Sequence, residues 1–326
     1  MKRILSILFA FFLTVVIALI AFYFWASSPN LDKTSYTQLF KNVYTVKTNQ
    51  DSIYSIISYN IGYLSGMTNN KAVQKNKDLF DNNLQITLDK FKKTKPDIIA
   101  FQEIDYNASR SFNINQEEEI AKLGYPFIAR GVNWDERYLP FPYWPPSVHF
   151  GKVISGQSIL SKYPIKDYNR IVLERVANSP FYRKAFYLDR LLQIVKINLQ
   201  NAELIVMNVH LEAFDKQTRE KQMQKVIELF TKQITKGQPT ILLGDFNSDP
   251  NYKNPAIEKL LNLPNIGNAA FTRSNYDFTY DTENPFERLD YIFYTENSIE
   301  YIDGKVLKSF GQISDHFPVE MRFKIK

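Results

Sequence analysis

The chain has 326 residues, of which 44% are apolar and 15% aromatic, and its formal charge at pH 7 is +6. This composition supplies enough apolar side chains for a large core and excludes global disorder. Because the chain has no cysteine, it has no disulfide, thiolate nucleophile or zinc–thiolate site. The charge excess, of which Lys2 and Arg3 supply two, is compatible with a polyanionic or phospholipid partner and also with an ordinary lysine-rich surface.

The first 26 residues form an apolar segment that suits a membrane span. The run from Ile4 to Trp25 carries no charge, and Lys2 and Arg3 precede it. As a helix it would be about 33 Å long, compared with about 30 Å of bilayer hydrocarbon. Its terminal aromatic cluster is typical of a membrane interface, and the positive-inside rule places the N-terminus in the cytoplasm. The sequence therefore predicts residues 1–26 as a transmembrane signal anchor, with the remaining chain outside the cytoplasm.

A cleaved signal peptide is the competing interpretation, and it would make the protein secreted. The apolar region of a signal peptide has about 7–15 residues and ends in small residues, whereas this run is longer and ends in bulky aromatics. Both interpretations export the rest of the chain. Residues 27–50 are polar with scattered aromatics and are predicted as a tether. Residues 51–326 are predicted as one α/β domain.

Apolar runs that suit buried strands alternate with segments of helical spacing from residue 53 onward. The spacing of apolar residues from Leu84 to Phe91 predicts a helix that Pro96 ends. A second apolar stripe, from Met223 to Ile234, predicts a core-facing helix that stops near Gly237. Buried strands are predicted at residues 53–59, 97–101, 158–160, 191–197, 204–209, 240–243, 289–294 and 318–325.

The segment from Tyr138 to Pro146 places four prolines among four aromatic residues. Such a segment does not suit a central strand, because proline lacks the amide hydrogen that a sheet needs. One interpretation is a stiff surface loop folded onto the domain. The other is an aromatic lip that contacts bases or lipid.

Asp245 and Asn247 follow the run from Thr240 to Leu243, which suits a buried strand. Side chains two residues apart on an extended segment point to the same face. We therefore expect a carboxylate and an amide side by side where this strand ends. A carboxylate holds a hard cation or polarises water, and an amide donates to a phosphate oxygen without adding negative charge.

Further polar residues stand at the ends of other apolar runs. Each alone suits a turn or a cap, but two of the chain's three histidines are among them. Together they supply oxygen ligands for a divalent ion, donors for phosphate oxygens and groups that titrate near neutral pH. They are Asn60, Glu103, His210, Asp290, Asp315 and His316.

The ordered segments around these residues resemble the endonuclease/exonuclease/phosphatase superfamily. That superfamily includes pancreatic-type deoxyribonucleases, abasic-site endonucleases, inositol polyphosphate phosphatases and bacterial sphingomyelinases. The resemblance covers roughly residues 50–326 and implies a four-layer α/β sandwich, in which two mixed sheets pack face to face with helices outside. The segments are Ser58-Tyr59-Asn60, Phe101-Gln102-Glu103, residues 156–165, Val209-His210-Leu211, Gly244-Asp245-Phe246-Asn247, residues 288–292 and Ser314-Asp315-His316.

The resemblance also implies a metal site. A Mg²⁺-type ion would bind Glu103, with Asn60 supporting the metal and phosphate site and Asp315 beside the metal. Mn²⁺ and Ca²⁺ are alternatives. A hard cation with oxygen ligands agrees with the absence of cysteine. Because Asp315 and His316 are neighbours, both reach one pocket only if they lie in a loop.

The roles of the remaining residues are implied in the same way. Asp245 would activate or orient the attacking water, and Asn247 would bind a phosphate oxygen. His316 would contact the scissile phosphate and assist charge or proton transfer, oriented by Asp290. His210 would donate to the phosphate. A carboxylate near an imidazole raises the pKa of the imidazole and determines its tautomer, which makes Asp290 and His316 a plausible couple on chemical grounds as well.

The sequence thus predicts a metal-dependent phosphodiesterase that is anchored in a membrane and acts outside the cytoplasm on nucleic acid or a phospholipid head group. A phosphomonoesterase is one alternative. A catalytically inactive, membrane-tethered binding module is another, although no member of the polar set is missing. The sequence indicates no protein partner.

Overall fold

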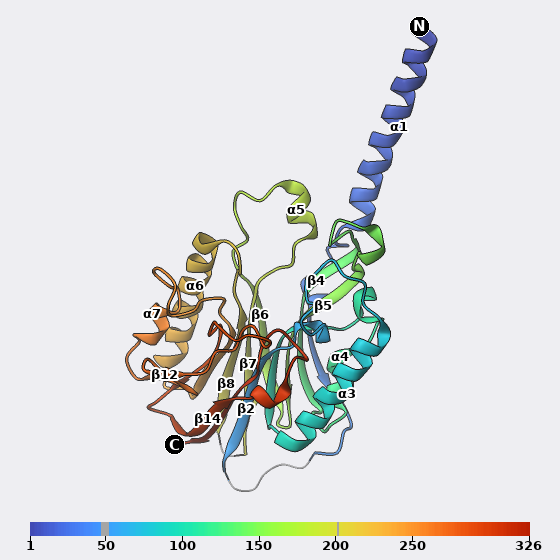
Figure 1. Cartoon of the computed structure of the whole chain (residues 1–326). Helices are drawn as coiled ribbons and strands as arrows, with labels where there is room; N and C mark the ends of the chain where they lie inside the picture. Colours follow the sequence, from blue (N-terminus) through green and yellow to red (C-terminus); the bar gives the residue numbers. More distant parts are fainter. Residues whose placement is uncertain (47–51, 201) are drawn as a thin grey trace.

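The computed structural model describes residues 1–46, 52–200 and 202–326, and two mixed β-sheets dominate it (Figure 1). The first sheet has seven strands in the order β1-β4-β5-β3-β2-β15-β14. Its β2 and β3 are parallel, and its other neighbouring strands are antiparallel. The strands are β1 (Thr37–Lys41), β2 (Tyr54–Asn60), β3 (Ile98–Asp105), β4 (Phe127–Leu139), β5 (Gly151–Ser161), β14 (Ile299–Val306) and β15 (Val319–Ile325).

The second sheet has six strands in the order β10-β13-β9-β8-β7-β6. Here β8 and β9 are parallel, and the other neighbours are antiparallel. The strands are β6 (Ile165–Val172), β7 (Leu191–Asn198), β8 (Glu203–His210), β9 (Thr240–Asp245), β10 (Ile266–Asn268) and β13 (Asp290–Thr295). A short hairpin pairs β11 (Phe271–Thr272) with β12 (Asn275–Tyr276).

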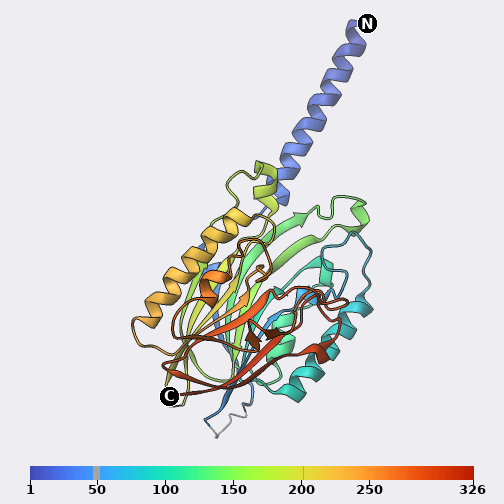
Figure 2. The ribbon, with the colours of Figure 1, turned by 60° about the vertical axis from the view of Figure 1, so that its left-hand side comes forward.

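Apolar side chains from both sheets form one buried cluster between them, in which Ile56 and Ile98 meet Val206 and Leu243. The long helices cover the outer faces (Figure 2). Helix α3 (Lys77–Thr94) packs on the first sheet, and α6 (Lys216–Ile234) packs on the second. The predicted sandwich with helices outside is confirmed. The shorter helices are α2 (Lys33–Tyr36), α4 (Gln116–Ala121), α5 (Phe181–Phe186) and α7 (Glu258–Leu261).

Both predicted helices form, and their ends follow from local chemistry. The Asn76 side chain accepts a hydrogen bond from the Leu79 amide and begins α3, which ends at Lys95 in a left-handed conformation just before Pro96. Asp215 begins α6 in the same way. Gly237, with φ of +68°, follows the end of α6.

Every predicted strand forms, but five strands of the sheets escaped the apolar-run criterion, namely β1, β4, β6, β10 and β14. In β4, buried and exposed residues mix with charges, and half-buried Arg130 forms an ion pair of 2.6 Å with Glu117. In β14, most residues are exposed or half-buried because β14 is an edge strand. Strand β6 is also an edge strand and is largely polar. Hydrophobic runs identify central strands and miss edge strands such as β6 and β14.

The range 27–50, predicted as a tether, contains more structure than expected. It includes α2 and β1, and β1 pairs with β4 from Thr37↔Gly131 to Lys41↔Phe127. The prediction of a plain tether is therefore wrong for residues 33–41. A polar segment can form an edge strand there because it pairs with one neighbouring strand on one side only. The predicted boundary at residues 50 and 51 lies outside the described residues.

Helix α1 (Lys2–Ala26) extends away from the sandwich (Figure 1). It is long and apolar enough to cross a membrane, a property that signal sequences share, and its apolar side chains are exposed. Only its last turns contact the domain. The Phe22 ring centroid lies 5.9 Å from that of Tyr138, and Arg137 Nη1 donates to the Trp25 carbonyl at 3.3 Å.

Candidate active site

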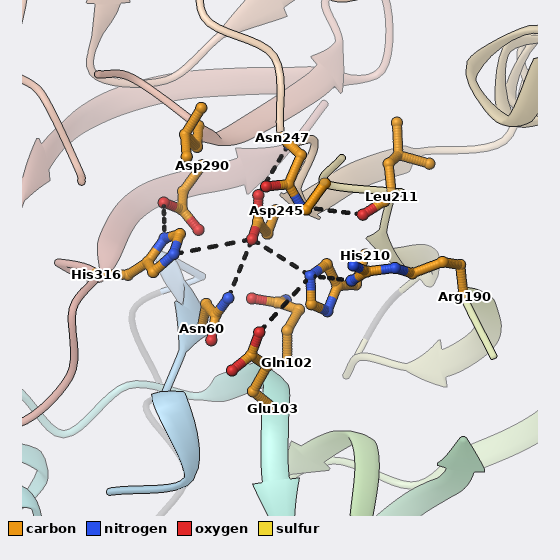
Figure 3. Close-up of polar contacts among 12 residues, drawn as sticks. Asn60, Gln102, Glu103, Arg190, His210, Leu211, Asp245, Asn247, Asp290 and His316 are labelled. Atoms are coloured by element: carbon orange, nitrogen blue, oxygen red, sulfur yellow. Dashed lines mark hydrogen bonds and ion pairs between the residues drawn. The ribbon is translucent and has the colours of Figure 1, made fainter. Parts of the chain in front are cut away.

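The predicted polar residues converge at one edge of the sandwich, where strands of both sheets end (Figure 3). Asn60, His210 and Asp245 are the last residues of β2, β8 and β9. Asp290 begins β13 directly opposite Asp245 in the antiparallel register. Because parallel strands end at the same edge, two packed sheets bring these side chains together although they are far apart along the chain.

Glu103 reaches the pocket because β3 is irregular there. Its φ is +52°, and the pairing of β3 with β5 shifts register between Phe101 and Ile104. Such a bulge redirects a side chain that a regular strand would place by simple alternation. Glu103 thus lies inside β3, not at its end as the sequence suggested.

Glu103 and Asp315 share a single amide donor. Asn69 Nδ2 donates to Glu103 Oε2 at 2.9 Å and lies 3.4 Å from Asp315 Oδ2. Burial raises the pKa of Glu103, and the nearby Asp315 carboxylate raises it further. Asp315 lies in the loop between Gly311 and β15, as its position beside His316 required. Asn69 was not anticipated, because its polar surroundings from Thr68 to Lys71 carry no distinctive signal.

Asp245 occupies the centre of the pocket. Its Oδ2 accepts from Asn60 Nδ2 at 3.0 Å, and its Oδ1 accepts from the Asn247 amide at 2.9 Å. Burial raises the pKa of Asp245 to about 7, while the neighbouring His316 opposes the shift. A carboxyl group with this pKa accepts a proton near neutral pH.

Asn247 is close to Asp245, but not for the reason that strand alternation gave. Its φ of +48° takes it out of the extended conformation, so the two side chains are not neighbours on one strand face. Asn247 Nδ2 donates to the Leu211 carbonyl at 2.9 Å, which places the side-chain amide beside the end of β8. The contact between the two residues comes from the turn itself.

His316 is held among carboxylates. Its Nδ1 donates to Asp290 Oδ2 at 2.8 Å, and its Nε2 lies 4.0 Å from Asp245 Oδ2. Burial disfavours the charged imidazole, but the ion pair and hydrogen bond with Asp290, helped by Asp245 and Asp315, raise the pKa of His316 well above its usual value. His316 is therefore an imidazolium at neutral pH.

His210 lies on the other side of Asp245 and meets a cation. Its Nε2 lies 2.5 Å from Arg190 Nη1 and 3.5 Å from Asp245 Oδ2. Burial lowers the pKa of His210 well below its usual value, and the charges of Arg190 and His316 lower it further. His210 is therefore neutral, with Nε2 accepting from the guanidinium.

Arg190 belongs to a buried network that the sequence analysis missed. Its Nε lies 3.5 Å from Glu212 Oε2, and Tyr187 Oη donates to Glu212 at 3.0 Å. Arg190 immediately precedes β7, whose Leu192 pairs with Val209 of β8. A charged residue just before an apolar run is the one signal that could have marked Arg190, but only the antiparallel register places it beside His210.

The donor set fits a hard divalent cation. Two arrangements of carboxylates are available, namely Glu103 with Asp315, and a group of Asp245, Asp290 and His316 whose ligand atoms lie within 4.8 Å of one another. His316 Nδ1 is engaged by Asp290, whereas Glu103 and Asp315 face each other with only one amide between them. Two half-buried carboxylates that share one amide donor suit a cation with oxygen ligands.

A two-sheet α+β sandwich that gathers carboxylates, amides and imidazoles at one edge is the architecture of hydrolases that act on phosphoester bonds. The chain belongs to the Endonuclease/Exonuclease/phosphatase family, whose sequence model matches residues 57–316. No curated protein matches the chain in sequence.

Solved structures share the fold. An endonuclease/exonuclease/phosphatase from Beutenbergia cavernae is 17% identical with a TM-score of 0.64, over 84% of this chain and 72% of that one. The human Nocturnin catalytic domain with bound sulfate is 16% identical with a TM-score of 0.59, over 89% and 98%. A mannosyl-6-phosphatase from Bacteroides thetaiotaomicron is 16% identical with a TM-score of 0.57, over 83% and 99%. At these identities the likeness is one of fold.

Proposed function

We propose that this protein is a divalent-metal-dependent phosphodiesterase whose catalytic domain is held at the outer face of a membrane by α1. One observation carries the proposal: the imidazolium of His316 and the imidazole of His210, which the Arg190 guanidinium contacts, lie on either side of the buried Asp245 carboxyl. The carboxylate pair of Glu103 and Asp315 lies next to them. The arrangement combines a proton acceptor, two cations and a metal-binding pair in one pocket. Phosphodiester hydrolysis needs each of them, because negative charge grows on the phosphate oxygens in the transition state.

Glu103 and Asp315 would hold the ion, with Asn60 beside them. Mg²⁺ is the expected ion, and Mn²⁺ and Ca²⁺ have the same preference for oxygen ligands. When bound, such an ion supplies positive charge to a non-bridging phosphate oxygen. Asn60 already donates to Asp245, and its Oδ1 accepts from the Gly62 amide at 3.1 Å.

The other residues handle protons and charge. Asp245 accepts a proton from the attacking water, in agreement with its pKa of about 7. His316 donates from Nε2 toward the phosphate, and Asp290 positions the ring through Nδ1. On the opposite side, Arg190 supplies the fixed positive charge, since its presence keeps His210 neutral. Asn247 supplies a side-chain amide beside the end of β8, on the side of His210.

The membrane location rests on α1. Lys2 and Arg3 precede the apolar stretch, which by the positive-inside rule places the N-terminus in the cytoplasm and the domain outside it. Secretion after cleavage of α1 is the alternative. Mass spectrometry of the mature protein tests it, because a chain that begins near Ser27 would have lost the anchor.

The activity test uses the full chain with Mg²⁺, Mn²⁺ or Ca²⁺, and with a chelator, on a chromogenic diester and a chromogenic monoester. We expect metal-dependent turnover of the diester, and its loss in Glu103→Gln. Glu300→Gln is the matched control, because Glu300 is exposed on β14. A metal-dependent rise in melting temperature, absent only in Glu103→Gln, reports metal binding separately. Diester turnover that survives the chelator would refute the metal dependence, and metal binding without any turnover would favour a binding module.

A further inference from the structure

Exposed aromatic side chains gather on the loops around the active site. They lie on four loops, which follow β4, β6, β8 and the β11–β12 hairpin along the chain. The exposed fractions run from 55% to 79%. We call these residues the aromatic rim: Tyr143, Trp144, Phe181, Tyr182, Phe214 and Phe286.

Contacts join the rim to the catalytic groups. The amide of Phe214 donates to Glu212 Oε1, the same carboxylate that accepts from Tyr187. The Phe286 ring centroid lies 5.6 Å from that of Tyr280, which lies 5.0 Å from that of His316. Two members of the rim, Phe214 and Phe286, are therefore joined to groups of the site.

The segment from Tyr138 to Pro146 combines both interpretations that its sequence allowed. Phe141 folds onto Phe150, with ring centroids 5.4 Å apart, and holds the loop against the domain. Tyr143 and Trp144 instead point outward, 69% and 78% exposed. A rigid loop that exposes its two largest aromatic side chains is suited to contact an apolar phase.

Two segments of the rim meet the end of α1, namely α5 and the loop that begins at Tyr138. The Tyr23 ring centroid is 5.7 Å from that of Phe181 and 5.9 Å from that of Phe186, and Tyr23 Oη donates to the Phe181 carbonyl at 3.5 Å. Figures 1 and 2 show α5 beside the end of α1 in both views. If α1 spans a bilayer, its aromatic end lies at the interface, and α5 lies at the same depth.

The composition of α5 suits that depth. It presents Phe181 and Tyr182 together with the exposed cations Arg183 and Lys184. Aromatic rings beside basic side chains are the usual composition of surfaces that bind phospholipid head groups. The opposite end of the sandwich, where β2 and β3 begin, instead exposes lysines in its described residues: Lys93, Lys95, Lys166, Lys236 and Lys326.

We propose that the aromatic rim rests on the outer leaflet of the bilayer, so that the active site opens onto the head groups, and that the substrate is a membrane lipid phosphodiester. The proposal rests on the phosphodiesterase activity and the anchor proposed above. In the reaction, water forms a new P–O bond while the P–O bond to one alcohol of the lipid breaks. Asp245 takes the proton of the water, and His316 gives a proton to the departing alcohol oxygen.

The absence of cysteine makes the rim easy to probe with single nitroxide labels in the full chain, reconstituted in phosphatidylcholine–phosphatidylglycerol nanodiscs. Labels at Tyr182→Cys, Trp144→Cys and Phe214→Cys should be more accessible to oxygen than to a water-soluble nickel complex. The control is Tyr301→Cys on β14, which is 37% exposed and lies away from the rim. Its label should show aqueous accessibility. Aqueous accessibility at all three rim positions would overturn the proposed surface.

A second measurement tests the substrate class. The ratio of head-group release from vesicle lipid to turnover of a soluble chromogenic diester should fall about tenfold in the double variant Tyr182→Ser/Trp144→Ser, because apolar burial at the interface is lost. Tyr301→Ser should leave the ratio unchanged. Hydrolysis of DNA or RNA without hydrolysis of lipid would overturn the inference and leave the proposed phosphodiesterase intact. Failure to hydrolyse the soluble diester as well would reject the proposed function itself.

Discussion

The two buried imidazoles of the pocket lie on opposite sides of Asp245 and meet opposite charges. His316 pairs with Asp290 at 2.8 Å, and its pKa rises well above the usual value. His210 meets Arg190 at 2.5 Å, and its pKa falls well below it. The same side chain at similar burial thus becomes a proton donor in one place and a neutral acceptor in the other. Because burial lowers the pKa of both imidazoles, the neighbouring charges account for the difference between them.

The largest effect on turnover is expected from replacing His316, the histidine that pairs with Asp290. Replacing His316 with Gln removes the imidazolium, and we expect turnover of a phosphodiester to fall by about 10²–10⁴-fold, the usual contribution of a positioned acid. Circular dichroism and the melting temperature check that the variant folds. Turnover within a few fold of the parent in a folded His316→Gln variant would contradict the assigned role.

Replacing Arg190 with Met tests the effect of the guanidinium on His210. Without the guanidinium the pKa of His210 should rise, which proton NMR of the imidazole would detect. Turnover should fall by about 10²-fold, because a fixed positive charge near the phosphate is lost. The variant Lys196→Met removes a cation from β7, the strand that Arg190 precedes, and should change neither quantity. If the pKa of His210 stays low in Arg190→Met, burial alone accounts for it.

The dependence of kcat/KM on pH should be bell-shaped. Activity should rise as the Asp245 carboxyl group loses its proton near pH 7, because only the carboxylate accepts a proton. It should fall at higher pH as His316 loses its own. Asp290→Asn removes the main charge that stabilises the imidazolium, so the alkaline limb should move to lower pH. An alkaline limb that does not move would show that it belongs to another group.

The smallest effect is expected from Tyr187→Phe. The hydroxyl donates to Glu212 and accepts from Arg190 at 3.3 Å, so its loss should loosen the guanidinium while leaving its charge in place. A hydrogen bond contributes about 1 kcal/mol, which corresponds to a change in turnover of about fivefold. Steady-state kinetics of Tyr187→Phe and Arg190→Met, measured in parallel, would rank the two effects on turnover. An effect of Tyr187→Phe as large as that of Arg190→Met would mean that position matters more than charge.

Several elements of the fold were open to prediction because their cause is local. The apolar stripe of α6, the run before Asp245 and the helix that stops at Pro96 all follow from periodicity and backbone chemistry. Strands β4 and β14 were not predictable in this way. In β4, half-buried Arg130 forms an ion pair with Glu117 that its sequence position does not indicate, and an edge strand such as β14 carries no apolar run.

The candidate site shows the same division. Residues at the ends of apolar strands, such as His210 and Asp245, stand out in the sequence, and the structure brings them together. Asn69 and Arg190 were missed, since both reach the pocket from segments with no such mark. Glu103 was identified from the sequence, but its orientation depends on a bulge in β3 that the sequence does not predict.

The amino-acid sequence by itself determined the apolar helix at the N-terminus and the inventory of acidic, amide and imidazole groups, because these follow from residue type and spacing. The layered fold was expected only from the family resemblance. Only the tertiary structure decided which imidazole is charged and on which side of the molecule the site opens. Arg190 just before β7, Asp245 of β9 and Asp290 of β13 lie 2.5–4.0 Å from the two imidazoles. The electrostatic energy of a buried group depends on such distances rather than on separation along the chain.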